Sequence, residues 1–198
     1  MSSMKWQLCS GNHSKCSMAE MKMSNSCWSE PLAKILKHNP ANPQPEIRLA
    51  VVGIGNELNG DDAAGVLVVR ALRAQLGSQP QLLLIEGGVA PEAFTGPLRR
   101  FAPDWVLLVD AAEMGEAAGH VAWVDWRLAD GLSATTHTLP PTMLAQFLMA
   151  ELGCQVALIG IQPQGLELDD GVSATVQEAV NAVTLELKRL LAPFAEGG

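Results

Sequence analysis

The chain has 198 residues, of which 48% are hydrophobic, enough for one domain with a substantial core and a tail. No apolar stretch approaches the roughly 18 residues needed to cross a bilayer, and the first residues lack the apolar segment of a signal peptide, which predicts a cytoplasmic protein without a membrane partner. The formal net charge is −8, and residues 49–198 carry seven Lys/Arg against eighteen Asp/Glu. Such an acidic chain argues against nucleic acid as a partner, because phosphate contacts need Lys and Arg.

Residues 1–46 differ in composition from the rest of the chain. They hold three of the four cysteines and five of the eight methionines, and they end in a proline-rich stretch that favours an extended linker. We expect this N-terminal extension to be disordered or weakly structured, and a domain to occupy residues 47–194. One alternative for the extension is a zinc site built from Cys9, His13, Cys16 and Cys27. Its spacing does not match the usual paired cysteines of structural zinc sites.

The first half of the domain alternates short apolar runs with longer segments of helical periodicity. In chain order it predicts a strand at 49–52, a helix at 61–76, a strand at 81–85, a helix at 91–100 and a strand at 105–109. The first of these helices carries an apolar stripe and is followed by Gly77, a residue type that commonly terminates helices.

The second half continues the alternation. It predicts an edge strand at 121–126, a helix at 141–152, a strand at 156–161 and a helix at 173–191. Strands that alternate with helices form parallel sheets covered by helices. The predicted fold class is therefore α/β, a twisted, mostly parallel sheet of about five strands with helices on both faces.

Metal-capable side chains follow three of the predicted segments. Asp62 comes after the first strand, Asp110 directly follows the third, and His137 lies in the loop before the helix at 141. Because the carboxyl ends of the strands in an open α/β sheet line the ligand crevice, we expect these side chains to converge there. Two carboxylates and one imidazole suit a divalent metal better than a phosphate. The sequence therefore predicts a metal site at this edge of the sheet.

Each of these residues also has a simpler explanation. An aspartate at the start of a helix caps it, a role that Asp61 alone would fill, leaving Asp62 free to face the crevice. Asp110 follows an apolar strand, so its carboxylate must be hydrogen-bonded, paired or liganded, and a loop contact would also satisfy it. A single histidine in a loop, such as His137, is often inert. The expected convergence of all three favours the functional interpretation.

A dinucleotide-binding loop is the main rival interpretation of the first turn. Gly53 and Gly55 supply two of its glycines, and Glu86 ends the second strand where a ribose-binding acid would lie. However, Leu58 occupies the third glycine position. The helix that follows opens with two aspartates, whose charges would repel a pyrophosphate at the terminus meant to bind it.

Several short segments occur in a characteristic order along the chain. They are Gly53-Ile54-Gly55-Asn56, Gly60-Asp61-Asp62-Ala63-Ala64-Gly65, Glu86-Gly87-Gly88, Val109-Asp110-Ala111, Thr136-His137-Thr138-Leu139-Pro140 and Gly160-Ile161-Gln162-Pro163. Together they resemble the endopeptidases that mature nickel–iron hydrogenases, over residues 49–192. The segments around His137 and Gln162 look most like the branch that serves formate-hydrogenlyase-type hydrogenases.

The resemblance implies an aspartic-type endopeptidase that removes a short C-terminal extension from a hydrogenase large-subunit precursor once nickel has been inserted. Asp62, Asp110 and His137 match the metal-contacting positions of that family, with Asp62 and Asp110 as the catalytic pair. The nickel would be carried by the precursor rather than held permanently by the enzyme. The domain itself contains a single cysteine, Cys154, and therefore no tight thiolate site of its own. Glu86 departs from the family pattern, where aspartate is common.

The alternative function is a non-proteolytic nucleotide-binding or nickel-carrier module. It predicts saturable binding of a dinucleotide, a flavin or free nickel, and no shortening of any precursor. The sequence does not distinguish whether a carboxylate or the metal activates water, and it specifies neither the bond that is cut nor the oligomeric state.

Overall fold

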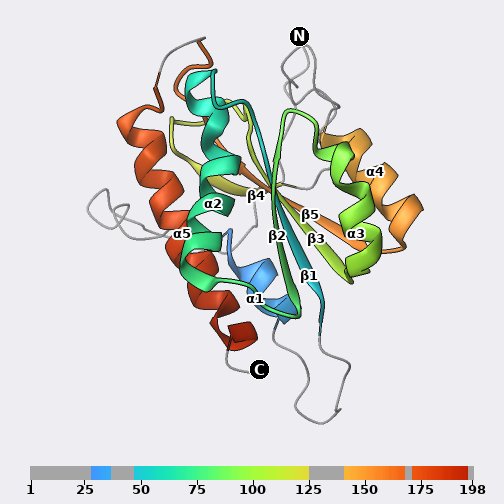
Figure 1. Ribbon diagram of the computed structural model, residues 1–198. Coiled ribbons are helices and arrows are strands. Elements are labelled where there is room, and N and C mark those ends of the chain that lie inside the picture. Colours follow the sequence, from blue (N-terminus) through green and yellow to red (C-terminus); the bar gives the residue numbers. More distant parts are fainter. Residues whose placement is uncertain (1–27, 37–46, 125–140, 168–170, 196–198) are drawn as a thin grey trace, which may run out of the picture.

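The computed structural model describes residues 28–36, 47–124, 141–167 and 171–195 (Figure 1). Its strands are β1 (Leu49–Ile54), β2 (Leu82–Gly88), β3 (Trp105–Ala111), β4 (Val121–Val124) and β5 (Gln155–Ile161). Its α-helices are α1 (Glu30–Leu36), α2 (Ala64–Leu76), α3 (Thr95–Phe101), α4 (Pro141–Leu152) and α5 (Ala174–Ala195). Two short 3-10 helices, η1 (Gly60–Ala63) and η2 (Pro91–Phe94), precede α2 and α3.

The five strands form one sheet in the order β2-β1-β3-β5-β4. β1 pairs in parallel with both β2 and β3, and β3 pairs in parallel with β5. β4 is antiparallel to β5 and forms one edge. The carboxyl ends of the four parallel strands therefore lie along a common edge of the sheet. The α/β class and the mostly parallel five-stranded sheet expected from the sequence are confirmed.

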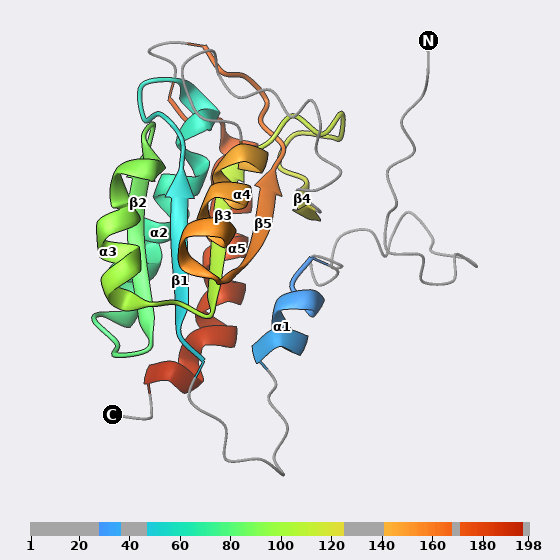
Figure 2. The same cartoon turned by 90° about the vertical axis from the view of Figure 1, so that its right-hand side faces the viewer.

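Helices cover both faces of the sheet (Figures 1 and 2). α2 and α5 pack on one face, where they enclose a core with alternate strand residues such as Val51, Leu107 and Ile159. α3 and α4 pack on the other face, over Val52, Leu108 and Leu158. Because successive side chains of a strand point to opposite faces, both faces need apolar residues. This double burial explains why the strands read as continuous apolar runs.

α1 lies within the N-terminal extension and, with the residues just before it, packs on the α2 and α5 face of the sheet. Trp28 and Leu32 are 4% and 1% exposed, and both belong to the core on the α2 and α5 face. The hydroxyl of Ser29 donates to Glu186 Oε1 of α5 at 2.9 Å. The two apolar residues are four positions apart, so a single turn of helix places them on one side. Their burial gives this short segment a fixed position that its composition did not indicate.

Both helices that follow β1 and β2 begin with a tighter turn than the sequence predicts. The helix expected at 61–76 starts as η1 and continues as α2, and the one expected at 91–100 starts as η2 and continues as α3. In η1 the N–H of Asp62 donates to the carbonyl of Asn59 at 3.0 Å, an i to i−3 bond. Such turns are frequent at helix N-termini and are not visible in apolar periodicity.

Candidate active site

Asp62 and Asp110 lie at the carboxyl edge of the sheet on neighbouring strands. Asp62 belongs to η1, which follows β1, and Asp110 is the penultimate residue of β3. β1 and β3 pair in register up to Gly53 and Val109, so both carboxylates extend from adjacent strand ends. Both are buried, at 6% and 9% exposure respectively. The structure therefore brings together two members of the predicted trio.

Glycines allow this close approach. A Cβ added at Gly65, in the first turn of α2, would lie 2.1 Å from the carbonyl oxygen of Val109 and 2.5 Å from that of Ile54. Gly55 has φ +134°, and a Cβ there would lie 1.7 Å from the carbonyl oxygen of Asp62. Side chains at either position would push the η1 segment away from the strand ends. The two glycines thus set the position of Asp62 beside Asp110.

The pKa values of both carboxyl groups are raised. Burial raises the pKa of Asp110 to about 7, with the charge of Asp62 as the second cause, against an opposing hydrogen bond from the backbone of Ala111. Burial also raises the pKa of Asp62, opposed by the N–H of Asn56, which donates to Asp62 Oδ2 at 2.9 Å. Near neutral pH the pair therefore holds a proton that it can exchange. This is a property suited to general acid and base catalysis.

Asp61 has a different role from the helix cap expected for it. It is 1% exposed and makes no capping bond to its own helix. Its carboxylate instead accepts the N–H groups of Gln164 at 2.7 Å and Gly165 at 3.2 Å. It also accepts the N–H of Ser173 at 2.7 Å and its hydroxyl at 3.0 Å. Asp61 thus fastens the loop that connects β5 to α5, and its neighbour Asp62 is the one that faces Asp110.

His137 falls in residues 125–140, outside the described part of the chain, so its position relative to the two aspartates stays a prediction. Within the described ranges, no group of three or more His, Cys, Asp or Glu side chains is placed to hold a metal ion. The same ranges contain no helix that is long and apolar enough to cross a bilayer.

Gln162 is a further residue that shapes the site, and its role was not predicted from the sequence. It is 3% exposed, and its Oε1 accepts the N–H groups of Met114 at 2.7 Å and Glu116 at 3.2 Å. Its Nε2 donates to Glu113 Oε1 at 2.8 Å. These bonds fix the loop that follows Asp110. The sequence did contain an indication of this role, because Gln162 is a polar residue directly after a buried strand. The same feature drew attention to Asp110.

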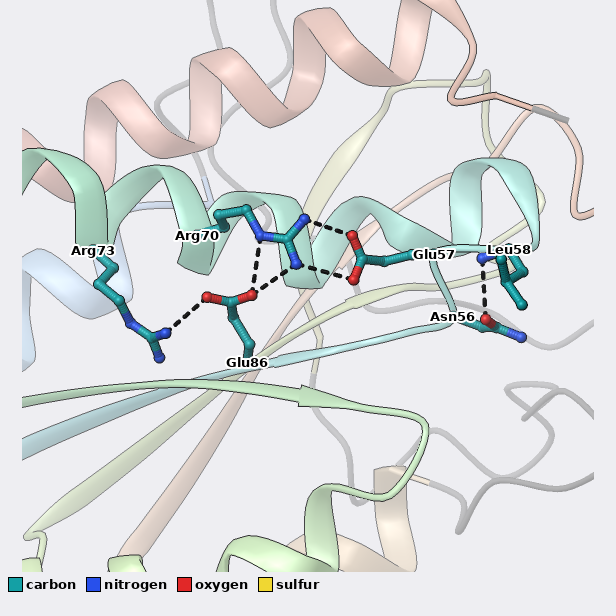
Figure 3. Close-up of polar contacts among 6 residues, drawn as sticks. All are labelled: Asn56, Glu57, Leu58, Arg70, Arg73 and Glu86. Carbon is teal, nitrogen blue, oxygen red and sulfur yellow. Dashed lines mark hydrogen bonds and ion pairs between the residues drawn. The ribbon is translucent and has the colours of Figure 1, made fainter. Parts of the chain in front are cut away.

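Glu57 and Glu86 form an ion-pair network on the outer side of α2 (Figure 3). Arg70 contacts both carboxylate oxygens of Glu57, at 2.5 and 2.9 Å, and Glu86 Oε2, at 2.7 Å. Arg73 contacts Glu86 Oε1 at 2.8 Å. Glu86, the candidate ribose-binding acid of the dinucleotide interpretation, is thus engaged by two arginines. Glu57 anchors the β1–η1 loop to α2.

Known proteins share this arrangement of strands and helices. The family model described as hydrogenase maturation protease matches residues 66–189. The hydrogenase 3 maturation protease of Escherichia coli strain K12 is 31% identical over 136 residues, which cover 68% of this chain and 85% of that protein. A NiFe hydrogenase maturation protease from Thermococcus kodakarensis has a crystal structure with a TM-score of 0.71 at 30% identity, covering 82% of this chain and 99% of its own.

A solution structure of an Escherichia coli endopeptidase is similar with a TM-score of 0.63 at 29% identity, covering 72% of this chain and 92% of that one. The match of the family model extends from α2 to α5 and so includes β3 with Asp110. The resemblance noted in the sequence is thereby confirmed. The chain belongs to the family of hydrogenase maturation proteases, which are endopeptidases and hence hydrolases.

Proposed function

We propose that this enzyme removes a short C-terminal extension from a hydrogenase large-subunit precursor after nickel has been inserted into that precursor. The observation that carries the proposal is the buried pair Asp62 and Asp110, in which the pKa of Asp110 is raised to about 7. Similarity to a hydrogenase 3 maturation protease supports a precursor of the formate-hydrogenlyase type. In this proposal residues 47–194 form the catalytic domain, with α1 as an added element that packs against it.

The carboxylate pair supplies the acid and base chemistry. Hydrolysis adds a water oxygen to the carbonyl carbon of the scissile peptide bond, breaks the bond to nitrogen, and delivers a proton to the departing amine. A carboxyl group with a pKa of about 7 is suited both to accept the proton from water and to return one to the amine. We assign this role to Asp62 and Asp110 as a unit, because interacting carboxyl groups titrate as a pair.

We further propose that Asp62, Asp110 and His137 complete the coordination of the nickel that the precursor carries. Carboxylate oxygen and imidazole nitrogen are acceptable nickel ligands, although thiolates bind it more tightly. Holding the ion at the sheet edge would fix the nearby scissile bond against the carboxylates, which favours reaction by orientation. The enzyme would then read the nickel as a signal that the precursor is ready for cutting.

Cys154 supports the assignment of nickel to the precursor rather than to the enzyme. It is 3% exposed, and burial raises the pKa of its thiol, which keeps it protonated. Its Sγ lies 3.8 Å from the carbonyl oxygen of Leu148 in α4. Since the thiolate is the metal-binding form of cysteine, this residue is unsuited to bind nickel. Since Cys154 is the single cysteine of residues 47–194, this domain offers no thiolate of its own, and tightly binding thiolates at the sheet edge are expected from the substrate.

Mass spectrometry of a nickel-loaded precursor incubated with the protein tests the proposal. We expect a shortened precursor and a released peptide, while nickel-free precursor stays intact. Asp110→Asn should slow cleavage by about 10²–10⁴-fold, because the acid and base group is lost. Asp104→Asn is a matched control, since Asp104 lies just before β3 at the opposite edge of the sheet and accepts the N–H of Arg48.

Two outcomes would contradict the proposal. Cleavage by the Asp110→Asn variant at the wild-type rate would remove the carboxylate pair from the chemistry. An intact precursor, together with saturable binding of a dinucleotide, a flavin or free nickel, would instead favour a carrier or nucleotide-binding module. The ion pairs that occupy Glu86 give no support to that alternative.

A further inference from the structure

Three large apolar side chains are exposed on loops at the carboxyl edge of the sheet. Leu58 follows β1 and is 63% exposed, Val89 follows β2 and is 51% exposed, and Leu166 follows β5 and is 39% exposed. We call these three residues the apolar rim. Among the described residues, the other large hydrophobic side chains with comparable exposure lie on α4 and α5. The apolar rim therefore consists of exposed side chains from three separate loops at this edge of the sheet.

Backbone hydrogen bonds join these loops around Asp62. The N–H of Gly55 donates to the carbonyl of Gly88 at 3.1 Å, which links the loop of Leu58 to that of Val89. The N–H of Asp61 donates to the carbonyl of Gly165 at 3.3 Å, which links the same segment to the loop of Leu166. The apolar rim thus belongs to a connected set of loops that also carries the proposed catalytic carboxylate.

Leu58 sits on a loop whose shape is fixed by local hydrogen bonds. The side-chain Oδ1 of Asn56 accepts the N–H of Leu58 at 3.1 Å, and the carbonyl of Asn56 accepts the N–H of Asn59 at 3.1 Å. The N–H of Asn56 donates to Asp62 Oδ2 at 2.9 Å. The turn that presents Leu58 is therefore continuous, through one residue, with the carboxylate of Asp62.

Arg70 braces the same loop from α2 (Figure 3). Its guanidinium group bonds both carboxylate oxygens of Glu57, the residue before Leu58, and its Nε and Nη2 bond Glu86 Oε2 at 3.0 and 2.7 Å. A single exposed ion pair contributes little to stability, but a fork that binds two carboxylates fixes their geometry. Arg70 thus holds the β1–η1 loop, on which the side chain of Leu58 is exposed to solvent.

Exposure alone would not distinguish Leu58, because isolated surface leucines are common. Leu185, on α5, is even more exposed at 68%. Leu58 differs in its surroundings, because its turn is hydrogen-bonded through Asn56 to the carboxylate of Asp62. The loops of Val89 and Leu166 are hydrogen-bonded to the same β1–η1 segment. A peptide bound with its carbonyl at Asp62 would therefore lie near these loops, which are hydrogen-bonded to the segment of Asp62. A rigid apolar contact there loses little conformational entropy on binding.

We propose that the apolar rim, with Leu58 as its principal contact, binds apolar side chains of the precursor that flank the scissile bond. This inference rests on the proposed function, because the rim is useful to the reaction only if Asp62 and Asp110 are the cutting groups. Leu58 is then a specificity-determining residue. Arg70 is a positioning residue, which acts through the loop that it braces.

Steady-state cleavage of nickel-loaded precursor tests the role of Leu58. Leu58→Ser should raise KM by about tenfold, the loss expected when the burial of a leucine side chain is removed from binding. The value of kcat should change less than twofold, because the lost contact is made equally in the ground state and the transition state. Leu185→Ser, an equivalent substitution at an exposed leucine of α5, should leave KM unchanged.

The same assay tests the contacts of Arg70 with Glu57 and Glu86. Arg70→Met should raise KM several-fold by releasing the loop, and Arg70→Lys should restore only part of the loss, because a lysine does not bind two carboxylates as a fork. Arg189→Met is the matched control, since Arg189 makes a two-point ion pair with Glu186 within α5. The Arg189→Met variant should cleave the precursor with the wild-type KM.

Failure of this inference is distinguishable from failure of the proposed function. If the wild-type protein cleaves the precursor and Leu58→Ser does so with the same KM, the apolar rim makes no substrate contact and the inference is overturned. If Leu58→Ser lowers kcat and leaves KM unchanged, the residue acts on the chemistry and the inference is again overturned. If the wild-type protein leaves the nickel-loaded precursor intact, the proposed function fails as well.

Discussion

At the scale of single residues, the proposed catalysis and the stability of the fold make opposite demands on Asp110. A carboxyl group is most stable where it is solvated or paired with a cation, whereas Asp110 is buried next to Asp62. Burial keeps its proton available near neutral pH and at the same time makes the ionised form costly. The neighbouring Asp61 shows the contrast, because its buried carboxylate accepts four hydrogen bonds and fastens a loop.

The raised pKa of Asp110 predicts a pH-dependent stability. The carboxyl titrates at about 7 in the folded protein and at about 3.9 when unfolded, so between these values the folded state binds more protons. The free energy of unfolding should therefore fall as pH rises from about 4 to 7, by a few kcal/mol, and then level off. Asp110→Asn should remove this contribution and gain stability over wild type at pH 8.

Urea unfolding of both proteins between pH 5 and 8 measures this effect. The difference between their unfolding free energies should widen as pH rises toward 7. Asp62→Asn provides a second check, since removing that charge should lower the pKa of Asp110. In this variant, the fall in unfolding free energy should therefore occur at lower pH than in the wild type. Curves for wild type and Asp110→Asn that stay parallel over the whole range would show that Asp110 titrates as an ordinary surface carboxyl.

At the scale of secondary-structure elements, the order of strands and helices could be predicted from the sequence. The 3-10 turns that begin two of the helices could not. Apolar runs predicted β1, β2, β3 and β5, because each is buried on both faces of the sheet. The 3-10 turns η1 and η2 depend instead on how closely each helix start approaches a strand end. That approach is a tertiary contact, and it cannot be predicted from the periodicity of apolar residues in the sequence.

Gly65 sets how closely α2 approaches the sheet, which predicts the effect of a substitution there. Gly65→Ala would place a methyl group 2.1 Å from the carbonyl oxygen of Val109, a backbone atom that cannot rotate away. We expect the free energy of unfolding to fall by about 3 kcal/mol, because the added methyl group overpacks the core. Cleavage should also be slower, because Asp62 would be pushed away from Asp110.

Gly96→Ala is the control for that substitution. In α3 a Cβ at Gly96 would have Arg100 Nη1 as its nearest contact, at 3.6 Å. Alanine there should stabilise the helix by about 0.5–1 kcal/mol. Chemical denaturation separates the two variants. Equal stability of Gly65→Ala and wild type would show that α2 has room to shift away from β3 without cost.

For the whole molecule, the sequence predicted the two-sided α/β architecture and the two aspartates, but not every part of the site. Asp62 and Asp110 were identifiable because carboxylates directly beyond buried strands require a partner. The contacts of Gln162 and Arg70 join residues 46–49 and 13–16 positions apart, and only the folded chain brings them together. The predicted third ligand, His137, stays a prediction because it lies outside the described ranges.

The N-terminal segment provides a prediction at this scale. Leu32 of α1 is 1% exposed in the core beneath α2 and α5. Leu32→Ala should lower the free energy of unfolding of the full chain by about 2–4 kcal/mol, the usual cost of deleting a buried leucine side chain. Lys34→Ala, at an exposed position of the same helix, should change it by less than about 0.5 kcal/mol. Equal melting temperatures for the two variants would mean that α1 contributes nothing to the core.

Nickel X-ray absorption spectroscopy tests the central claim most directly. Nickel-loaded precursor should gain nitrogen and oxygen ligands when the wild-type protein is added and the sample is frozen before cleavage is complete. Asp62→Asn, Asp110→Asn and His137→Ala should each reduce that gain. A nickel spectrum that stays unchanged on addition of a wild-type protein that goes on to cleave the precursor would contradict the account.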